Sequence, residues 1–331
     1  MKSGSRRLSA PRTLVFATGM GAFNALTGGL LEAGDHLLVA NIAYPGVTEF
    51  ATTILKRQGV EASFVDPTDL DAIRAAIRPK TRLFHVETPA NPILRVVDLK
   101  AIAEITRARG VKLSVDSTIA TPLGIRPLEH GADFVVHSLS KYLSGHGDAL
   151  GGAILGEKAA LSSIRKEQLI RMGATLSPFS AFLILRGLET LVPRMRLHEE
   201  NARVVEAFLA EHPKVRRVLW PGSERHPQHE LAKRTMRNFS GLLSFSVHGD
   251  SAEVARQIAE RAQVFSYAVS LGKTKSLIFY IPTEPILRDS FSLDERSEAI
   301  YRDWAGEGVF RVSVGLEDAD DLVDDLRRAL G

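Results

Sequence analysis

The sequence predicts an α/β protein with one large, mostly parallel sheet, followed by a smaller α+β portion. Two observations favour this class. Short apolar runs alternate with amphipathic segments from Thr13 to about residue 180, and the pattern then changes. In addition, a chain of 331 residues exceeds what one hydrophobic core usually holds together. We therefore expect two domains.

The first part of the chain alternates predicted strands with predicted helices. The apolar runs typical of buried strands are residues 14–17, 36–40, 62–65, 83–86, 112–115 and 134–136. Residues 70–77 and 99–109 between them are typical of amphipathic helices. Gly110 follows the second helix, where a left-handed residue is expected to close it.

The second part begins with a long helical pattern from about Ser180 to Leu209. Strand-like runs follow at residues 241–247, 276–281 and 310–314, with helices between them. We place the domain boundary near Pro193. This gives a short basic tail at residues 1–12, a first domain at 13–192 and a C-terminal domain at 193–331.

Composition excludes several classes of function. The net charge is only +3 and the basic residues are scattered, so no nucleic-acid partner is expected. The absence of cysteine excludes disulfides, a thiolate nucleophile and cysteine-ligated metal, and no metal site is expected. No apolar stretch is long enough to span a bilayer and no secretion signal is recognisable, so the cytoplasm is the expected location.

Ligands of open α/β sheets bind beyond the carboxyl ends of the strands, and one residue there is a lysine. Lys141 lies among serines and glycines in VVHSLSKYLSGHGDALGG. An amine kept partly neutral by its surroundings can form a Schiff base with an aldehyde. Taken alone, a lysine at a strand end is more often simply solvated.

Neighbouring residues favour an aromatic, phosphorylated cofactor. Asp116 ends a predicted strand and can keep a pyridine nitrogen protonated, although a helix cap or turn is its ordinary role. Free N–H groups of residues 18–21 at a helix start suit a phosphate, with Ser138 and Ser140 as further donors. The same stretch imitates a dinucleotide fingerprint, but Asn24 replaces its third glycine, so NAD is the weaker alternative.

Two further residues stand out by their surroundings. Tyr44 follows a predicted strand and can stack on an aromatic ring and move a proton, or it is an ordinary loop tyrosine. Arg311 lies inside an apolar strand, where a guanidinium needs a partner such as a substrate carboxylate. A structural ion pair with Glu317 or Asp318 is the alternative for Arg311.

Taken together, these segments resemble the Cys/Met metabolism family of pyridoxal 5′-phosphate (PLP) enzymes, which includes the cystathionine γ-synthases, the cystathionine lyases and methionine γ-lyase. The resemblance begins at about Thr13 and runs to the C-terminus. It passes through ATGMGA, ETPANP, VDSTIATP, HSLSKYLSGHGDALGG, SPFSAFLILRGLETLVPRM, SLGKTKSL and FRVSVGLEDADDL. It implies PLP as cofactor and fold type I (aspartate-aminotransferase-like), with residues 13–192 as the PLP-binding domain.

The resemblance also implies a role for each matching residue. Lys141 would hold PLP covalently and act as the base, Asp116 would pair with the pyridinium nitrogen, and Tyr44 would stack on the ring and assist the leaving group. Asn91, Ser270 and Arg311 would bind the substrate carboxylate. The other implied cofactor-binding residues are Gly19, Met20, Asn91, Thr118, Ser138 and Ser140.

The implied activity is β- or γ-elimination, or γ-replacement, on cystathionine, methionine or an acylated homoserine. The implied assembly is a homodimer or homotetramer. Family members begin with a segment whose Tyr-x-Arg pair reaches the neighbour's cofactor phosphate, and this sequence starts too late to contain it. A catalytically weak or silent PLP-binding relative is therefore one alternative, and an aminotransferase or racemase is another.

Overall fold

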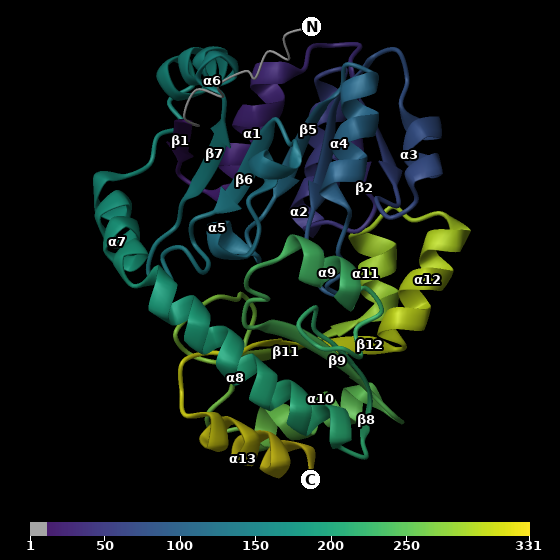
Figure 1. The fold of residues 1–331 in the computed structure, drawn as a ribbon, viewed down its shortest axis with the longest axis vertical. Coiled ribbons are helices and arrows are strands. Elements are labelled where there is room, and N and C mark those ends of the chain that lie inside the picture. The colour runs from purple at the N-terminus through teal and green to yellow at the C-terminus, as the bar shows by residue number, and fades with distance from the viewer. Residues whose placement is uncertain (1–11) are drawn as a thin grey trace, which may run out of the picture.

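The computed structural model describes residues 12–331 and contains two sheets, each covered by helices (Figure 1). Of the expected basic tail, residues 1–11 lie outside the described residues, and Arg12 begins the first strand. Within the described chain, none of the helices combines the length and the apolar character needed to cross a membrane.

The first sheet has seven strands in the order β1-β7-β6-β5-β4-β2-β3. β7 runs antiparallel to β1 and β6, and the other neighbours are parallel, as the sequence predicts. The strands are β1 Arg12–Phe16, β2 His36–Ala40, β3 Glu61–Val65, β4 Thr81–Glu87, β5 Lys112–Asp116, β6 Phe134–Ser138 and β7 Gly152–Gly156.

Helices cover both faces of this sheet because its strands are apolar on both sides. Leu38 of β2 packs in one core cluster while its neighbours Leu37 and Val39 pack in another, as alternation across a strand requires. The helical segments are α1 Gly19–Leu30, α2 Pro45–Phe50, η1 Ala51–Leu55, α3 Leu70–Ala76, α4 Leu99–Ala108, α5 Thr121–Gly124, η2 Pro127–His130, α6 Lys158–Ile164 and η3 Arg165–Arg171. Gly110 follows α4 with φ +67°, which confirms the predicted left-handed residue.

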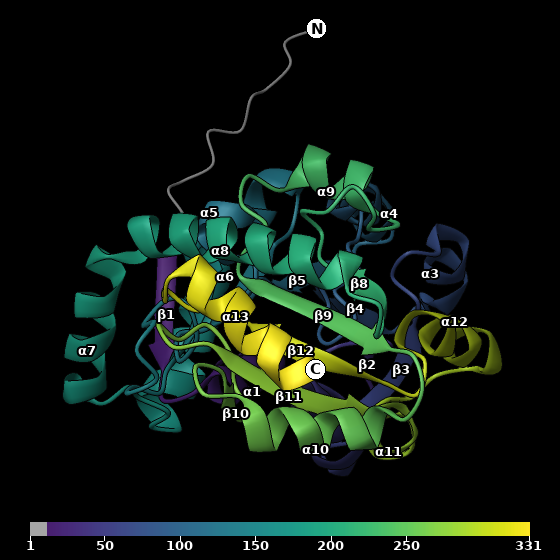
Figure 2. The ribbon, with the colours of Figure 1, turned by 90° about the horizontal axis from the view of Figure 1, so that it is seen from below.

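The second sheet has five strands in the order β10-β11-β12-β9-β8. Its strands are β8 Val215–Leu219, β9 Leu242–Val247, β10 Ser266–Tyr267, β11 Leu277–Pro282 and β12 Gly308–Ser313. Its helices are α9 His229–Thr235, α10 Ser251–Arg261, α11 Thr283–Asp289, α12 Glu295–Ala305 and α13 Ala319–Leu330. α8 Leu191–Glu211 and α13 lie across this sheet (Figure 2).

The long helical pattern after residue 180 forms two helices rather than one. α7 Pro178–Glu189 and α8, which begins at Leu191, are separated by Thr190, which caps both helices. Pro193 lies in the first turn of α8, where a missing N–H breaks no helical hydrogen bond. The proposed domain boundary therefore falls at the start of this connecting helix.

Candidate active site

The candidate site lies beyond the carboxyl ends of β4, β5 and β6. The parallel register places Glu87, the last residue of β4, opposite Asp116, the last residue of β5. Ser138 ends β6, and a Cβ on Gly19 at the start of α1 would lie 3.1 Å from Ser138 Cβ. The fold therefore brings together residues from four separate segments at one sheet edge.

Lys141 follows β6 in a turn that directs its amine toward the second sheet. Lys141 Nζ donates a hydrogen bond to Ser270 Oγ (2.9 Å) across 129 positions of sequence. Gly272 makes this approach possible, because its φ is +76° and a Cβ there would lie 2.6 Å from the Tyr142 nitrogen. Burial, followed by the nearby charges of Arg311 and Lys273, lowers the pKa of the Lys141 amine.

Arg311 links Ser270 to Asn91 at the same place. Its guanidinium donates from Nη2 to the Ser270 carbonyl oxygen (3.0 Å) and from Nη1 to Asn91 Oδ1 (3.2 Å). The ion-pair alternative from sequence is not formed, because Glu317 accepts hydrogen bonds from Ser276 instead. Asp318 does not pair with Arg311 either, since it caps α13. Arg311 is thus held by neutral groups, and an anion can still bind it.

Two carboxylates lie side by side at the other end of the site. Asp116 Oδ1 accepts the Thr118 N–H (2.8 Å), and burial raises the pKa of Asp116. Burial and the Asp116 carboxylate raise the pKa of Glu87. Glu87 also holds two neighbouring loops, since its two oxygens accept the N–H of Tyr44 (2.6 Å) and of Asn91 (3.0 Å).

The start of α1 provides free backbone N–H groups. Thr18 caps the helix, accepting the Gly21 N–H at its hydroxyl (2.9 Å) and the Ala22 N–H at its carbonyl (3.0 Å). The N–H groups of Gly19 and Met20 have no partner within the helix, which is the arrangement that binds a phosphate.

The hydroxyl residues near this helix start are engaged with backbone groups. Thr118 Oγ1 accepts the Ser138 N–H (2.8 Å) and so ties β6 to the loop after β5. The Ser140 hydroxyl is bonded to the Gly151 backbone (3.0 and 3.3 Å).

Tyr44 stands at the open side of the site. Its side chain is 51% exposed. A Cβ on Gly46 would lie 2.7 Å from the Tyr44 ring and 3.4 Å from the Met20 sulfur, so the three residues are close neighbours. An exposed ring beside a helix start with free N–H groups can stack on an aromatic ligand.

Comparison with known proteins decides the family. The Cys/Met metabolism PLP-dependent enzyme family matches residues 8–331. The chain belongs to this family. It is therefore a PLP-dependent enzyme, and its two-sheet architecture is that of fold type I.

Relatives in this family are similar over nearly the whole chain. A canavanine γ-lyase of Pseudomonas canavaninivorans is 40% identical over 96% of this chain and 78% of its own length. A cystathionine β-lyase of Coxiella burnetii is 41% identical over 97% of this chain and 82% of its own length. The crystal structure of cystathionine γ-lyase from Lactobacillus plantarum complexed with L-serine has a TM-score of 0.86 and 34% identity, covering 96% of this chain and 81% of that one.

The described residues fit PLP. Asp116 forms no ion pair with any residue in 12–331, which leaves its carboxylate available to a protonated pyridine nitrogen. The N–H groups of Gly19 and Met20 suit the phosphate, and the Lys141 amine lies in the same region. Within the described residues, no group of three or more His, Asp or Glu side chains is placed to hold a metal ion.

Sequence reasoning assigned no role to Glu87 or Lys273. Glu87 had a recognisable signal, because it ends a predicted strand beside the ETPANP motif. Lys273 gave no such signal. Its effect on Lys141 depends on a loop that returns from the second sheet.

Proposed function

We propose that the enzyme catalyses β- or γ-elimination, or γ-replacement, on an amino acid such as cystathionine, methionine or an acylated homoserine. The observation that carries this proposal is the chain Lys141–Ser270–Arg311. It places a basic amine and a carboxylate-binding guanidinium on the same serine, at 2.9 and 3.0 Å. An α-amino acid carries an acidic α-proton next to a carboxylate, so it needs a base and a cation that lie close together, as these two groups do.

The positions of the residues around Lys141 support a proposed role in cofactor binding for each of them. When bound, PLP withdraws electrons from the bonds at the substrate α-carbon. Asp116 would hold the pyridine nitrogen protonated, and Tyr44 would cover the exposed face of the ring. The phosphate would lie at the helix start, against Gly19, Met20, Thr118, Ser138 and Ser140.

Lys141 is the proposed proton carrier. Its lowered pKa raises the neutral fraction of the amine near neutral pH, and a neutral amine can accept a proton. Arg311, Asn91 and Ser270 would hold the substrate carboxylate and so fix the α-carbon beside Lys141 Nζ. Since these groups are all present and the relatives are named as lyases and synthases, nothing favours a silent protein.

A homodimer or homotetramer is part of this proposal, and its support is an exposed apolar face. Phe179, Phe182 and Leu185 of α7 are 70%, 60% and 65% exposed. α7 lies at the outer edge of the molecule in both views (Figures 1 and 2). A contiguous apolar face of this kind is typical of a protein interface. A cytoplasmic location stays a prediction.

The test is a substrate panel. Cystathionine, L-methionine, L-cysteine, acylated homoserines and L-canavanine are supplied to the PLP-loaded enzyme, and ammonia, 2-oxo acid and thioether products are identified. Canavanine is included because of the canavanine γ-lyase relatives. We expect turnover of at least one compound in the wild type and none in Lys141→Ala. No product from any of them would contradict the proposal.

A further inference from the structure

The loop at residues 88–97 brings Asn91 to Arg311 and is itself entirely buried. Leu94, within the loop, has φ +56°, a left-handed conformation that is unfavourable for leucine. Such a residue persists only where its surroundings hold it. The position of Asn91 therefore depends on what fixes this loop.

Gln228 fixes the far end of the loop by pairing with both backbone groups of Val96. Gln228 Oε1 accepts the Val96 N–H (2.8 Å), and Gln228 Nε2 donates to the Val96 carbonyl oxygen (2.8 Å). The other end is held by Ser244, whose hydroxyl donates to the Pro92 carbonyl oxygen (2.6 Å). Ser244 is the β9 residue opposite Arg311, so the second sheet holds both the loop and the guanidinium that the loop meets.

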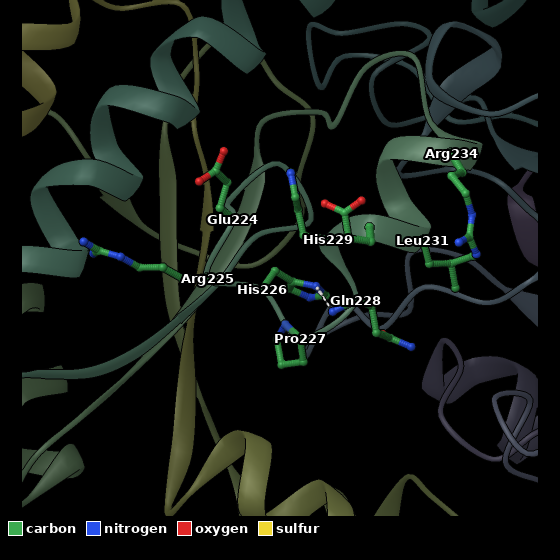
Figure 3. Close-up of a pocket in the computed structure, with 9 residues that line it drawn as sticks. Glu224, Arg225, His226, Pro227, Gln228, His229, Leu231 and Arg234 are labelled. Carbon is green, nitrogen blue, oxygen red and sulfur yellow. Dashed lines mark hydrogen bonds between the residues drawn. The ribbon is translucent and has the colours of Figure 1, made fainter.

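Gln228 is itself held in place by the turn at residues 226–228. Its N–H donates to His226 Nδ1 (3.2 Å), a bond between two residues that line a surface hollow of about 830 Å³ (Figure 3). The His226 ring lies 5.5 Å from Trp304. α9, which follows Gln228, buries Ala232 in the core of the first sheet. The turn therefore rests on both halves of the molecule.

We propose that Gln228 is a positioning residue for the substrate carboxylate. By fixing Val96, it sets the place at which Asn91 meets Arg311, although Gln228 itself lies outside the site. The inference rests on the proposed role of Arg311 as the carboxylate-binding residue. It assigns a purpose to the half-buried amide of Gln228 that the chemistry of the site alone does not require.

The test compares two ligands that differ only in the carboxylate. The PLP-loaded enzyme is titrated with L-methionine and with 3-(methylthio)propylamine, its decarboxylated analogue, and the change in the cofactor spectrum gives both affinities. In Gln228→Ala we expect affinity for L-methionine to fall about tenfold while affinity for the amine is unchanged. Loss of stability alone would leave the ratio of the two affinities unaltered.

Three further variants complete the design. Gln257→Ala is the matched control, because its amide bonds only to Glu253 on the same helix (2.9 Å), and we expect the wild-type ratio. Ser244→Ala removes the contact at the other end of the loop and should also lower the ratio of the affinity for L-methionine to the affinity for the amine. This variant keeps the test decisive if Gln228→Ala does not fold. Arg311→Ala should abolish the preference for the carboxylate.

The outcomes separate the inference from the proposed function. If Arg311→Ala keeps the wild-type ratio, the proposed carboxylate site is wrong, and the role of Gln228 falls with it. The other outcome is that Arg311→Ala no longer prefers L-methionine over the amine, while Gln228→Ala, or Ser244→Ala in its place, has the wild-type ratio of the two affinities. In that case the proposed carboxylate site is supported and the positioning role of Gln228 is overturned.

Discussion

At the scale of the residue, the pKa values in the site depend on ionisable side chains that are buried and lie close to one another. Lys141 lies near two cations, while Asp116 and Glu87 lie near one another. Each arrangement favours the neutral form of a group that is ordinarily charged. The chemistry of this site is therefore sensitive to single charge changes.

Lys273 offers one such change. Lys273→Met removes a cation that lowers the pKa of Lys141, so that pKa should rise. Only the neutral amine attacks the PLP aldehyde. The pH profile of PLP uptake by the cofactor-free Lys273→Met protein should therefore lie at higher pH than that of the wild type. Stopped-flow absorbance across a pH series measures it. Lys275→Met, an exposed neighbour outside this set, is the control. An unmoved profile in Lys273→Met would contradict the account.

Glu87 offers a second change, visible in stability. The pKa of Glu87 is higher in the folded protein than in the unfolded chain, where it is about 4.3. The protonated side chain therefore makes its full contribution to the free energy of unfolding below that pH, and the contribution is lost as pH rises through the folded pKa. Glu87→Gln does not titrate, and its single amide oxygen cannot accept both the Tyr44 and Asn91 N–H groups. We expect the variant to have the lower melting temperature at pH 5.

The difference in melting temperature between Glu87→Gln and the wild type should then narrow toward pH 8, because only the wild type has the contribution of Glu87 to lose over that range. Thermal unfolding of the cofactor-free protein at both pH values measures it. Glu104→Gln, an exposed carboxylate on α4, is the control. A difference that stays the same at both pH values would show that Glu87 is not raised in pKa.

At the scale of the element, strand and helix ends place the functional groups. Gly19→Ala would put a methyl group 3.1 Å from Ser138 Cβ, at the proposed phosphate site. We expect PLP affinity to fall by about tenfold, the effect of an overpacking penalty of about 1–3 kcal/mol. Gly28→Ala in the same helix meets only the end of the Gln168 side chain and should keep wild-type affinity. Fluorescence titration measures both, and equal affinities would contradict the assignment.

Sequence reasoning predicted most elements whose signal is local. The apolar runs from β2 to β6 and the closure of α4 at Gly110 follow from side-chain pattern and glycine conformation. It missed β7, which begins at Gly152. That glycine is required because a Cβ there would clash with the Thr18 backbone, so its reason is a distant contact. The two-residue β10 is too short to leave a pattern.

The contacts of the site were beyond the reach of local pattern. Residue types pointed to Lys141, Asp116 and Arg311, but the bond from Lys141 to Ser270 joins segments of two different sheets. The same is true of Gln228, whose amide reaches Val96 across 132 positions. Such pairs are fixed by the packing of the whole chain, and no spacing in the sequence encodes them.

At the scale of the whole molecule, the apolar face of α7 predicts self-association. Replacing Phe179 and Phe182 with aspartate puts charges in the proposed interface, and we expect the sedimentation coefficient to fall to that of a single chain. Tyr267→Asp, at an exposed aromatic residue of β10, should leave the assembly intact. A wild type that already sediments as a single chain would contradict the proposed dimer.

The central claim is that the Lys141 amine is the group that binds PLP covalently. The most direct test is to reduce the PLP-loaded protein with borohydride, which fixes a lysine–PLP linkage, and to map the labelled peptide by mass spectrometry. The account predicts one phosphopyridoxyl group per chain, on the peptide containing Lys141, and none in Lys141→Ala. A label on another lysine such as Lys273, or no label at all, would contradict it.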